Sequence, residues 1–443
     1  MTQPTIRRLQ PASRLEGSIR LPSDKSIAHR ALICAALASG RSEITLREPG
    51  ADLMSTISAL RALGVSIRHQ PSGGLASVSV HGLGDESSIG ALSSGVGDCG
   101  NSGTSMRLMA GVVASGSGVA TLVGDESLSR RPMQRVADPL RAMGAEIELN
   151  EGHAPLVVRG RRPLRAMEHT LTVASAQVLG AISFAALAAE GTTTVHVPGR
   201  VRDHTERMLS ALGADVQRTA DANGATTAIR GPSALQHFEL VVPGDFSSAS
   251  AWIVAGALHA DANIRLTDVG LNQTRTALLE VMRRLGADIE VLPARADGGE
   301  PVGDIVVRGG QRLHAISLGA ADVAPLIDEL PLLAVAMAAA NGISEVRGAR
   351  ELRIKESDRI AAIGAALTAA GVEFEELEDG WRIRADWPRE AHVVTHGDHR
   401  IAMAMAVAAW IGVATSVELD DPQCVAVSYP SFWSDARSIG AFG

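Results

Sequence analysis

The sequence predicts an α/β protein of two lobes, each built from three repeated units. Two observations lead to this prediction. The chain has 443 residues, which is too long for one compact core and favours two domains of about 200 residues each. A pattern of helix end, glycine and strand start also recurs six times, and six copies divide naturally into two sets of three.

Most copies of the repeat follow the same physical plan. A Leu/Met pair three residues apart lies on one helix face, a glycine supplies the left-handed end of the helix, and the next residues alternate as in a strand. The glycines are separated by roughly 70 to 85 residues, enough for two helices and about four strands. The six copies are residues 60–67, 140–147, 209–216, 282–289, 367–374 and, in degraded form, 436–442.

The lobes are expected to comprise residues 21–243 and residues 1–20 plus 244–443. Proline-containing segments beginning at Pro22 and Pro243, PSDKS and PGDFS, mark the two passages of the chain between lobes. Residues 15–21 alternate like a strand that is donated back to the second lobe. Two passages imply a hinge and a cleft that closes on a ligand. Evenly spaced units also suit a structural solenoid, so the motifs between the repeats must decide.

Composition excludes several classes of protein. A content of 46% hydrophobic and 20% charged residues is typical of a globular chain. A net charge of −8 and 3% aromatic residues argue against binding to nucleic acid or anionic membrane. No apolar run is long enough to span a bilayer, and no secretory signal is recognisable. Three widely spaced cysteines without a CxxC pair predict reduced thiols in the cytoplasm.

Lysine is almost absent from the chain. Of 41 basic residues, only Lys25 and Lys355 are lysines. Because arginine serves everywhere else, these two positions indicate sites that need a compact ammonium rather than a planar guanidinium. Chance survival is the alternative, but both lysines lie in charged motifs.

Several motifs in the first half place polar residues at predicted helix starts, where backbone N–H groups and the helix dipole favour an anion. DKSIAHR carries Lys25, Ser26 and Arg30, and GNSGTSMR carries Gly103. Three shorter motifs add hydroxyl, amide and guanidinium donors of the kind that oxyanions recruit. These motifs are SRRPM with Arg131, ASAQ with Ser175, Ala176 and Gln177, and RDHT with Arg202. Each motif alone also fits a capped helix start or a solvated surface turn.

The second half contributes acids as well as cations. Asp328 and Glu329 precede a predicted helix, where an acidic pair also serves simply to complement the dipole. LRIKESDR places Lys355, Glu356 and Arg359 within about one helical turn, which combines a donor, a titratable acid and a clamp; a solvated helix face is the alternative.

THGDHRIAM offers two histidines and Asp398 but no distant further ligand, so an anion contact by Arg400 is favoured over a metal site. Most motifs thus share one plan, a polar turn at a helix start with a basic residue attached. If such helix starts converge, they form a cationic cleft for ligands with several negative charges. Two small anions fit this prediction better than a single one.

As a set, the motifs resemble those of the 5-enolpyruvylshikimate-3-phosphate synthase family, in the family's order from residue 21 to about 433. They are LPSDKSIAHR, CGNSGTSMRL, DESLSRRPM, ASAQ, VRDHTERM, PGDFSSAS, LNQTRT, LRIKESDR and GDHRIAMAMAV. The resemblance implies two inverted lobes of three βαβαββ units. It implies transfer of the carboxyvinyl group of phosphoenolpyruvate to the 5-hydroxyl of shikimate 3-phosphate, on the route to chorismate, with no metal or organic cofactor. We expect a cytoplasmic monomer without nucleic-acid or membrane partners.

The resemblance also implies roles for the site residues. Asp328 matches the base for the 5-hydroxyl, Glu356 matches the acid toward the vinyl carbon, and Lys355 would bridge both substrates. Shikimate 3-phosphate would be held mainly by the first lobe, through Lys25, Ser26, Arg30, Ser175, Ala176, Gln177 and Arg202. Phosphoenolpyruvate would be surrounded by Gly103, Arg131, Arg359 and Arg400, with Lys25 also reaching it.

Four positions depart from the family pattern. Val427 stands where many relatives carry a lysine near phosphoenolpyruvate, Ala176 replaces a second serine, and Ser23 with Asp24 replaces a more usual Gly-Ser. Gly103 keeps the glycine whose replacement by a methyl-bearing residue accompanies glyphosate tolerance in some relatives, so sensitivity to glyphosate is expected.

Two alternatives come from other classes. The sister enzyme that uses UDP-N-acetylglucosamine has a cysteine in a mobile loop, but the corresponding residues 126–133 contain none, and DKS stands where that enzyme has a Lys-Asn pair. A repeat scaffold that binds anions without turnover would not need Asp328, Glu356 and both lysines together.

Overall fold

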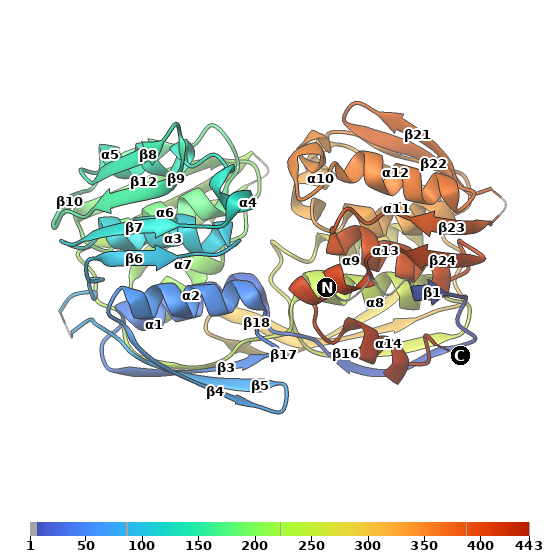
Figure 1. The fold of residues 1–443 in the computed structure, drawn as a ribbon, viewed down its shortest axis with the longest axis horizontal. Helices are drawn as coiled ribbons and strands as arrows, with labels where there is room; N and C mark the ends of the chain where they lie inside the picture. The colour runs from blue at the N-terminus through green and yellow to red at the C-terminus, as the bar shows by residue number, and fades with distance from the viewer. Residues whose placement is uncertain (1–6, 86, 222, 387, 443) are drawn as a thin grey trace. The chain divides into compact units, whose positions relative to one another are not determined.

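The computed structural model describes residues 7–85, 87–221, 223–386 and 388–442 (Figure 1). They form a mixed α/β fold that divides into two compact units. Unit 1 contains Met1–Pro22, Pro243–Arg295 and Pro301–Gly443, and unit 2 contains Ser23–Val242 together with Ala296–Glu300.

Unit 2 has three sheets of one design. In each, a central strand has a parallel neighbour on one side and an antiparallel hairpin on the other. The first sheet contains β15 (Glu239–Val241), β3 (Arg41–Arg47), β5 (Leu75–His81) and β4 (Ser66–Ser72). The second contains β6 (Gly95–Asp98), β7 (Val119–Val123), β9 (His153–Arg159) and β8 (Glu146–Asn150). The third contains β10 (Leu164–Arg165), β11 (Glu168–Thr170), β12 (Ala189–Pro198), β14 (Gly224–Gly231) and β13 (Asp215–Ala220).

Three helices of unit 2 form its interior (Figure 1). They are α1 (Lys25–Leu37), α3 (Gly103–Ala114) and α6 (Ala176–Ala186), and most of their residues are buried. A Cβ added to Gly111 would lie 2.1 Å from the carbonyl oxygen of Ala181, so only glycine lets α3 pack this closely on α6. The remaining helices are α2 (Ala51–Ala62), α4 (Glu126–Ser129), α5 (Gln134–Ala142) and α7 (His204–Ala211).

Unit 1 repeats the design of the sheets. One sheet contains β2 (Leu15–Arg20), β16 (Ala262–Gly270), β18 (Glu300–Arg308) and β17 (Asp288–Asp297). The second contains β19 (Ser317–Leu318), β20 (Ile343–Val346), β22 (Gly380–Arg384) and β21 (Glu373–Leu377). The third contains β23 (Glu390–Val393), β24 (Ser416–Leu419) and β1 (Arg7–Leu9). In the third sheet β1 takes the place of the antiparallel hairpin, which accounts for the degraded sixth repeat.

Helices α8 (Phe246–Leu258), α11 (Leu330–Ala339) and α13 (His399–Trp410) form the interior of unit 1. Trp252 of α8 stacks on Trp410 of α13 with ring centroids 5.8 Å apart, so aromatic residues, scarce in the chain, gather here. The other helices are α9 (Ala277–Leu285), α10 (Ala320–Val323), α12 (Arg359–Ala369) and α14 (Phe432–Ser438). The 3-10 helices are η1 (Ala324–Leu326), η2 (Arg350–Ile354) and η3 (Pro422–Val427).

The glycines of the repeat adopt the conformation that the sequence predicts. All six have φ between +86° and +110°, in the left-handed region. They are Gly64, Gly144, Gly213, Gly286, Gly371 and Gly440. A strand follows each of the first five glycines, so the predicted helix-glycine-strand junction is confirmed there, whereas no strand follows Gly440 within the described residues.

The strands at the two passages between units are exchanged. β2 leads directly into α1 of unit 2 but pairs in parallel with β16 of unit 1. β15 leads into α8 of unit 1 but pairs in parallel with β3 of unit 2. The tip of the β17–β18 hairpin, Ala296–Glu300, also belongs to unit 2. There Oε1 of Glu300 lies 2.8 Å from Nδ1 of His204. No pattern in the sequence predicts this third connection.

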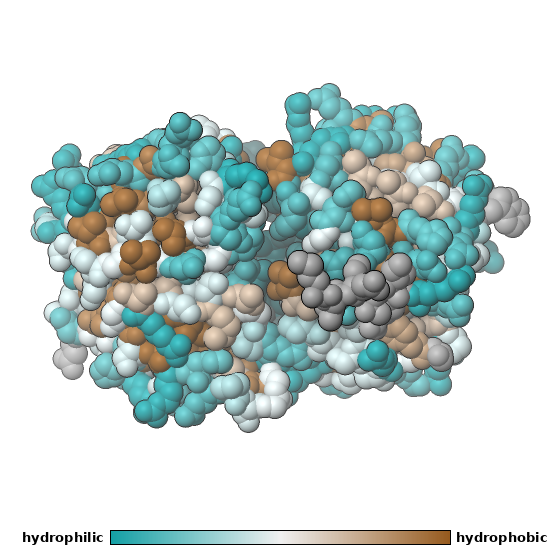
Figure 2. Space-filling view, viewed as in Figure 1, coloured by the Kyte–Doolittle hydropathy of each residue, from teal (hydrophilic) through white to brown (hydrophobic). Residues whose placement is uncertain are grey.

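On the face drawn in Figure 2, polar residues cover most of the surface and apolar ones lie in small groups. Within the described ranges, no helix has both the length and the apolar character needed to cross a bilayer.

Candidate active site

The inner helices of unit 2 begin at capped turns, and the predicted residues lie at these turns. Asp24 accepts the backbone N–H of Ile27, Ser102 that of Ser105, and Ser175 that of Val178. Side-chain caps leave other first-turn N–H groups directed outward, where they favour an anion. Lys25 and Ser26 open α1, Gly103 opens α3, and Ala176 and Gln177 open α6.

Lys25 and Arg30 are both held on α1 by neighbouring helices. The ammonium of Lys25 lies 2.8 Å from the carboxylate of Asp52 on α2. Burial raises the pKa of Asp52, but the charge and hydrogen bond of Lys25 outweigh it and the net pKa is lowered. Arg30 is buried and donates to the hydroxyl of Thr205 on α7 at 2.7 Å and to the carbonyl of Ser26 at 2.8 Å.

A second group of donors links α3 and α6. Gln177 donates to Thr104 at 3.0 Å and accepts from Arg107 at 2.8 Å. Arg131, after α4, donates to Asn101 at 2.8 Å. Burial, aided by the charges of Arg131 and Arg135, lowers the pKa of Arg107 to about 10. Sequence reasoning missed Arg107, although it ends the motif GNSGTSMR, which was the available signal.

Arg202 precedes α7 and lies close enough to Arg30 for their charges to interact. The pKa of Arg30 is lowered, mainly by burial and also by the charge of Arg202. The charges of Glu206 and Asp24 oppose this lowering. Two guanidiniums that repel each other favour a ligand carrying negative charge. The predicted residues of unit 2 are thus gathered at the starts of α1, α3, α6 and α7 and around Arg131.

Glu206 on α7 gives a prediction about stability. It is 3% exposed, and burial raises its pKa to about 7, opposed by Arg218 and Arg30. Because the folded pKa lies above the ordinary value of 4.5, its contribution to stability is complete below that pH and is lost as the pH rises through about 7. Between pH 5 and 8 the wild type should therefore lose up to about 3 kcal/mol of unfolding free energy relative to Glu206→Gln.

Urea unfolding of both proteins at each pH measures this difference. The exposed Glu148→Gln, whose partner Arg159 is also exposed, is the matched control and should follow the wild type. Parallel pH dependence of the wild type and Glu206→Gln would contradict the prediction.

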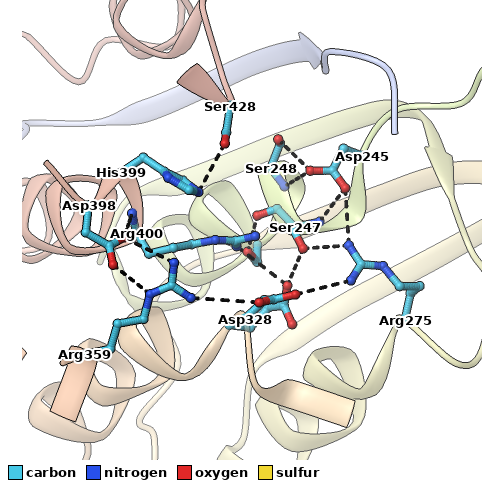
Figure 3. Close-up of polar contacts among 12 residues, drawn as sticks. Asp245, Ser247, Ser248, Arg275, Asp328, Arg359, Asp398, His399, Arg400 and Ser428 are labelled. Carbon is cyan, nitrogen blue, oxygen red and sulfur yellow. Dashed lines mark hydrogen bonds and ion pairs between the residues drawn. The ribbon is translucent and has the colours of Figure 1, made fainter. Parts of the chain in front are cut away.

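In unit 1, Arg359 gathers the acidic residues (Figure 3). Its guanidinium is 1% exposed, lies 2.8 Å from Asp398, donates to Glu356 at 2.6 Å and lies 3.9 Å from Asp328. Burial opposes the charge of Asp398, but the hydrogen bond and charges of Arg359 prevail and the pKa of Asp398 is lowered. Reciprocally, the net pKa of Arg359 is raised despite its burial. Asp328, Glu356 and Arg359 are therefore brought together as predicted residues of one cluster.

The expected helical turn across Lys355, Glu356 and Arg359 is wrong. Lys355 directly follows η2 in extended conformation, and Arg359 begins α12 three residues after Glu356. The cause is Asp358, which takes extended backbone angles and accepts the N–H groups of Ile360 and Ala361 as the cap of α12. Lys355 instead pairs with Glu351 at 2.9 Å.

A polar chain connects Arg400 through Glu329 to two residues that sequence reasoning did not single out, Ser247 and Arg275. Glu329, 1% exposed, accepts from the hydroxyl of Ser247 at 2.5 Å and lies 3.7 Å from Nη1 of Arg400. Ser247 in turn accepts from Arg275 at 2.6 Å. Nη1 of Arg400 is buried and has no hydrogen-bond partner within the described residues. A phosphate or carboxylate oxygen would satisfy this donor.

The residues weighed as metal ligands serve other contacts. Asp398 accepts from Arg359, from the hydroxyl of Ser357 at 2.9 Å and from the backbone N–H of Arg400 at 2.9 Å. His399 lies 3.2 Å from the hydroxyl of Ser428. Val427, at the end of η3, is 53% exposed, so a longer side chain could be accommodated there.

Comparison with known sequences gives full-length matches. The sequence model of the family described as EPSP synthase (3-phosphoshikimate 1-carboxyvinyltransferase) matches residues 9–435. A protein of Salinibacter ruber named 3-phosphoshikimate 1-carboxyvinyltransferase is 44% identical over 440 residues, covering 98% of this chain and 99% of the relative. A protein of the same name from Gloeobacter violaceus is 47% identical over 437 residues, covering 97% and 98%.

Solved structures agree with the sequence matches. The EPSP synthase of Acinetobacter baumannii matches with a TM-score of 0.88 at 37% identity, covering 98% of each chain. The enolpyruvyl transferase NikO of Streptomyces tendae has a TM-score of 0.73 at 19% identity, covering 99% of this chain and 98% of that one, and supports the fold alone. The predicted enolpyruvyl transferase fold is confirmed. Because motif order, fold and full-length similarity agree, the chain belongs to the EPSP synthase family.

Proposed function

We propose that this chain transfers the carboxyvinyl group of phosphoenolpyruvate to the 5-hydroxyl of shikimate 3-phosphate and releases phosphate, a step on the route to chorismate. The observation that carries the proposal is the cluster around Asp328. This carboxylate, 22% exposed, lies 3.9 Å from each of two buried guanidiniums, and one of them also binds Glu356. The cluster thus combines a base, an acid and cations for an anionic substrate. Membership of the family supports the same reaction.

In the proposed mechanism Glu356 gives a proton to the methylene carbon of phosphoenolpyruvate, which leaves C2 electron-poor. The 5-hydroxyl oxygen attacks C2 as Asp328 removes its proton. The tetrahedral adduct then expels phosphate with the electron pair of the C–O bond, and Glu356 takes back a proton from the new methyl group, which restores the double bond of the carboxyvinyl group. Arg359 and Arg400 stabilise the charge that develops on the leaving group.

We assign shikimate 3-phosphate mainly to unit 2, where Lys25, Ser26, Arg30, Ser175, Ala176, Gln177 and Arg202 supply its donors. We assign phosphoenolpyruvate to Gly103, Arg131, Arg359 and Arg400, and we assign Lys355 to both substrates. In the structure Lys25 pairs with Asp52, and Lys355 pairs with Glu351. Binding would exchange these partly exposed ion pairs for substrate oxygens at little cost, because such pairs are weak.

We further propose a monomer that works in the cytoplasm without a metal or organic cofactor and without nucleic-acid or membrane partners. Cys34, Cys99 and Cys424 are buried free thiols, as expected in a reducing compartment. A net charge of −8 disfavours polyanions and anionic membranes.

The test is phosphate release from the purified protein given both substrates, beside controls that lack one of them. Release that requires shikimate 3-phosphate and phosphoenolpyruvate together is the expected result. Release with UDP-N-acetylglucosamine in place of shikimate 3-phosphate would assign the chain to the sister reaction. Folded protein that releases no phosphate with either acceptor would overturn the proposal in favour of binding without turnover.

Gly103→Ala should weaken phosphoenolpyruvate binding while leaving the fold intact. The added methyl would lie 2.7 Å from Nη1 of Arg107 and 3.3 Å from Nη1 of Arg131. Both atoms end flexible side chains, which can move away at the expense of a charge-assisted hydrogen bond. We expect the KM for phosphoenolpyruvate to rise about tenfold, and millimolar glyphosate to inhibit the wild type more than the variant. The KM for shikimate 3-phosphate is the internal control; a rise in it of the same size would contradict a local effect.

A further inference from the structure

Arg275 lies in unit 1 just before α9, in the segment LNQTRT. Its side chain is only 5% exposed, so its charge must be met by acceptors inside the protein. Nη2 donates to Ser247 at 2.6 Å and lies 3.3 Å from Asp245, and Nη1 lies 3.9 Å from Asp328 (Figure 3). The guanidinium therefore joins the start of α8 to the turn that carries the proposed base.

The carboxylate of Asp328 lies between two cations. Oδ2 faces Arg275 and Oδ1 faces Arg359, each at 3.9 Å. Two guanidiniums on different oxygens restrict rotation of the carboxylate, and both favour its ionised form. A base must be ionised and correctly aimed before it can take a proton.

Both arginines also contact other carboxylates. Arg359 lies 2.8 Å from Asp398 and 2.6 Å from Glu356. Arg275 lies 3.3 Å from Asp245. Another charged pair close by is Glu329, next in sequence to Asp328, with Arg400 of α13 at 3.7 Å.

We propose that Arg275 is a positioning residue for Asp328, which it keeps ionised and aimed at the 5-hydroxyl of the acceptor. This inference rests on the proposed function, in which Asp328 is the base. Arg275 also reaches the anion-binding side of the cluster, because the Ser247 hydroxyl accepts from it and donates to Glu329 beside Arg400.

The experiment is the pH profile of kcat for Arg275→Gln, which removes the charge and keeps a donor for Ser247. We expect kcat to fall most, by up to about tenfold, on the acid side of the wild-type limb and to fall least at alkaline pH. The acid limb should move about one unit to higher pH. The KM for shikimate 3-phosphate should change less than twofold, and Arg275→Lys should restore the acid limb because it restores the charge.

Asp245→Asn is a second variant, for which we expect the acid limb of the kcat profile to move in the opposite direction. It removes the negative partner of Arg275 and retains a side-chain oxygen to cap α8, so the acid limb should move to lower pH. Arg283→Gln is the control for stability, because Arg283 lies on α9, the helix that Arg275 precedes, but its side chain donates to the carbonyl of Ile289. Its pH profile should match the wild type.

Equal loss of kcat at every pH in Arg275→Gln, or the same shift in Arg283→Gln, would overturn the positioning role. If Arg275→Gln does not fold, the test is Asp245→Asn. The positioning role is then overturned if the acid limb of this variant stays in place or moves to higher pH. Wild-type protein that is inactive with both substrates would overturn the proposed function itself. The two failures are distinguishable because only the second abolishes wild-type turnover.

Discussion

Asp328→Asn should lower kcat by about 10²–10⁴-fold, because the amide cannot accept the proton of the attacking 5-hydroxyl. The substitution keeps the size of the side chain and an oxygen to face Arg275 or Arg359. Substrate binding should therefore change little, and the loss should appear in kcat rather than in KM. Steady-state kinetics with both substrates, together with a binding measurement for shikimate 3-phosphate, give the two quantities separately.

Asp322→Asn is the matched control for Asp328→Asn. Asp322 lies on α10, a few residues earlier, and pairs with Arg284 at a partly exposed site. Its replacement should leave kcat within about twofold of the wild type, since exposed ion pairs contribute little. If Asp328→Asn retained most of its kcat, the base would have to be another group, and the proposed mechanism would be wrong in that step.

Arg359→Met should cost about 3–5 kcal/mol of unfolding free energy as well as activity. It leaves the carboxylate of Asp398, which is 0% exposed, without the guanidinium that lies 2.8 Å away. Because the folded pKa of Asp398 is lowered from 3.8, the contribution of the pair is complete above that pH and is lost as the pH falls below it. The difference in stability between wild type and variant should accordingly narrow in acid.

A double variant separates stability from catalysis. Arg359→Met with Asp398→Asn removes both buried charges, and the asparagine retains an oxygen for the N–H at the start of α13. Chemical denaturation should show most of the lost stability restored, since the uncompensated charge is gone. Phosphate release should remain defective, because the cation proposed to face phosphoenolpyruvate is absent. Recovery of both properties would show that Arg359 has only a structural role.

The repeat and the helix starts could be predicted because they depend on local chemistry. Glycine after a Leu/Met helix face is required wherever the chain turns in the left-handed region, and Gly64 through Gly440 all do so. Asp24, Ser102 and Ser175 cap helices through residues three positions ahead. Periodicity and capping act over a few residues, so a single sequence reveals them.

The pairings inside the site could not be predicted because they join residues far apart in the chain. Nothing near Arg275 indicates that its partners are Ser247 and Asp328. Likewise Arg107 gives no local sign of Gln177. The prediction of a helical turn at Lys355 is wrong because LRIKESDR also fits a continuous helix. The cap formed by Asp358 interrupts that helix.

The hairpin tip at Ala296–Glu300 has a consequence for dividing the protein. Any uninterrupted stretch of chain that contains all of unit 2 also contains part of unit 1, because these residues arrive more than fifty positions after Val242. A fragment ending at Val242 would keep His204, 1% exposed, and lose the carboxylate of Glu300 at 2.8 Å. During synthesis, unit 2 can therefore be completed only after the first hairpin of unit 1 has emerged, which makes the two halves of this enzyme partners in folding rather than independent modules.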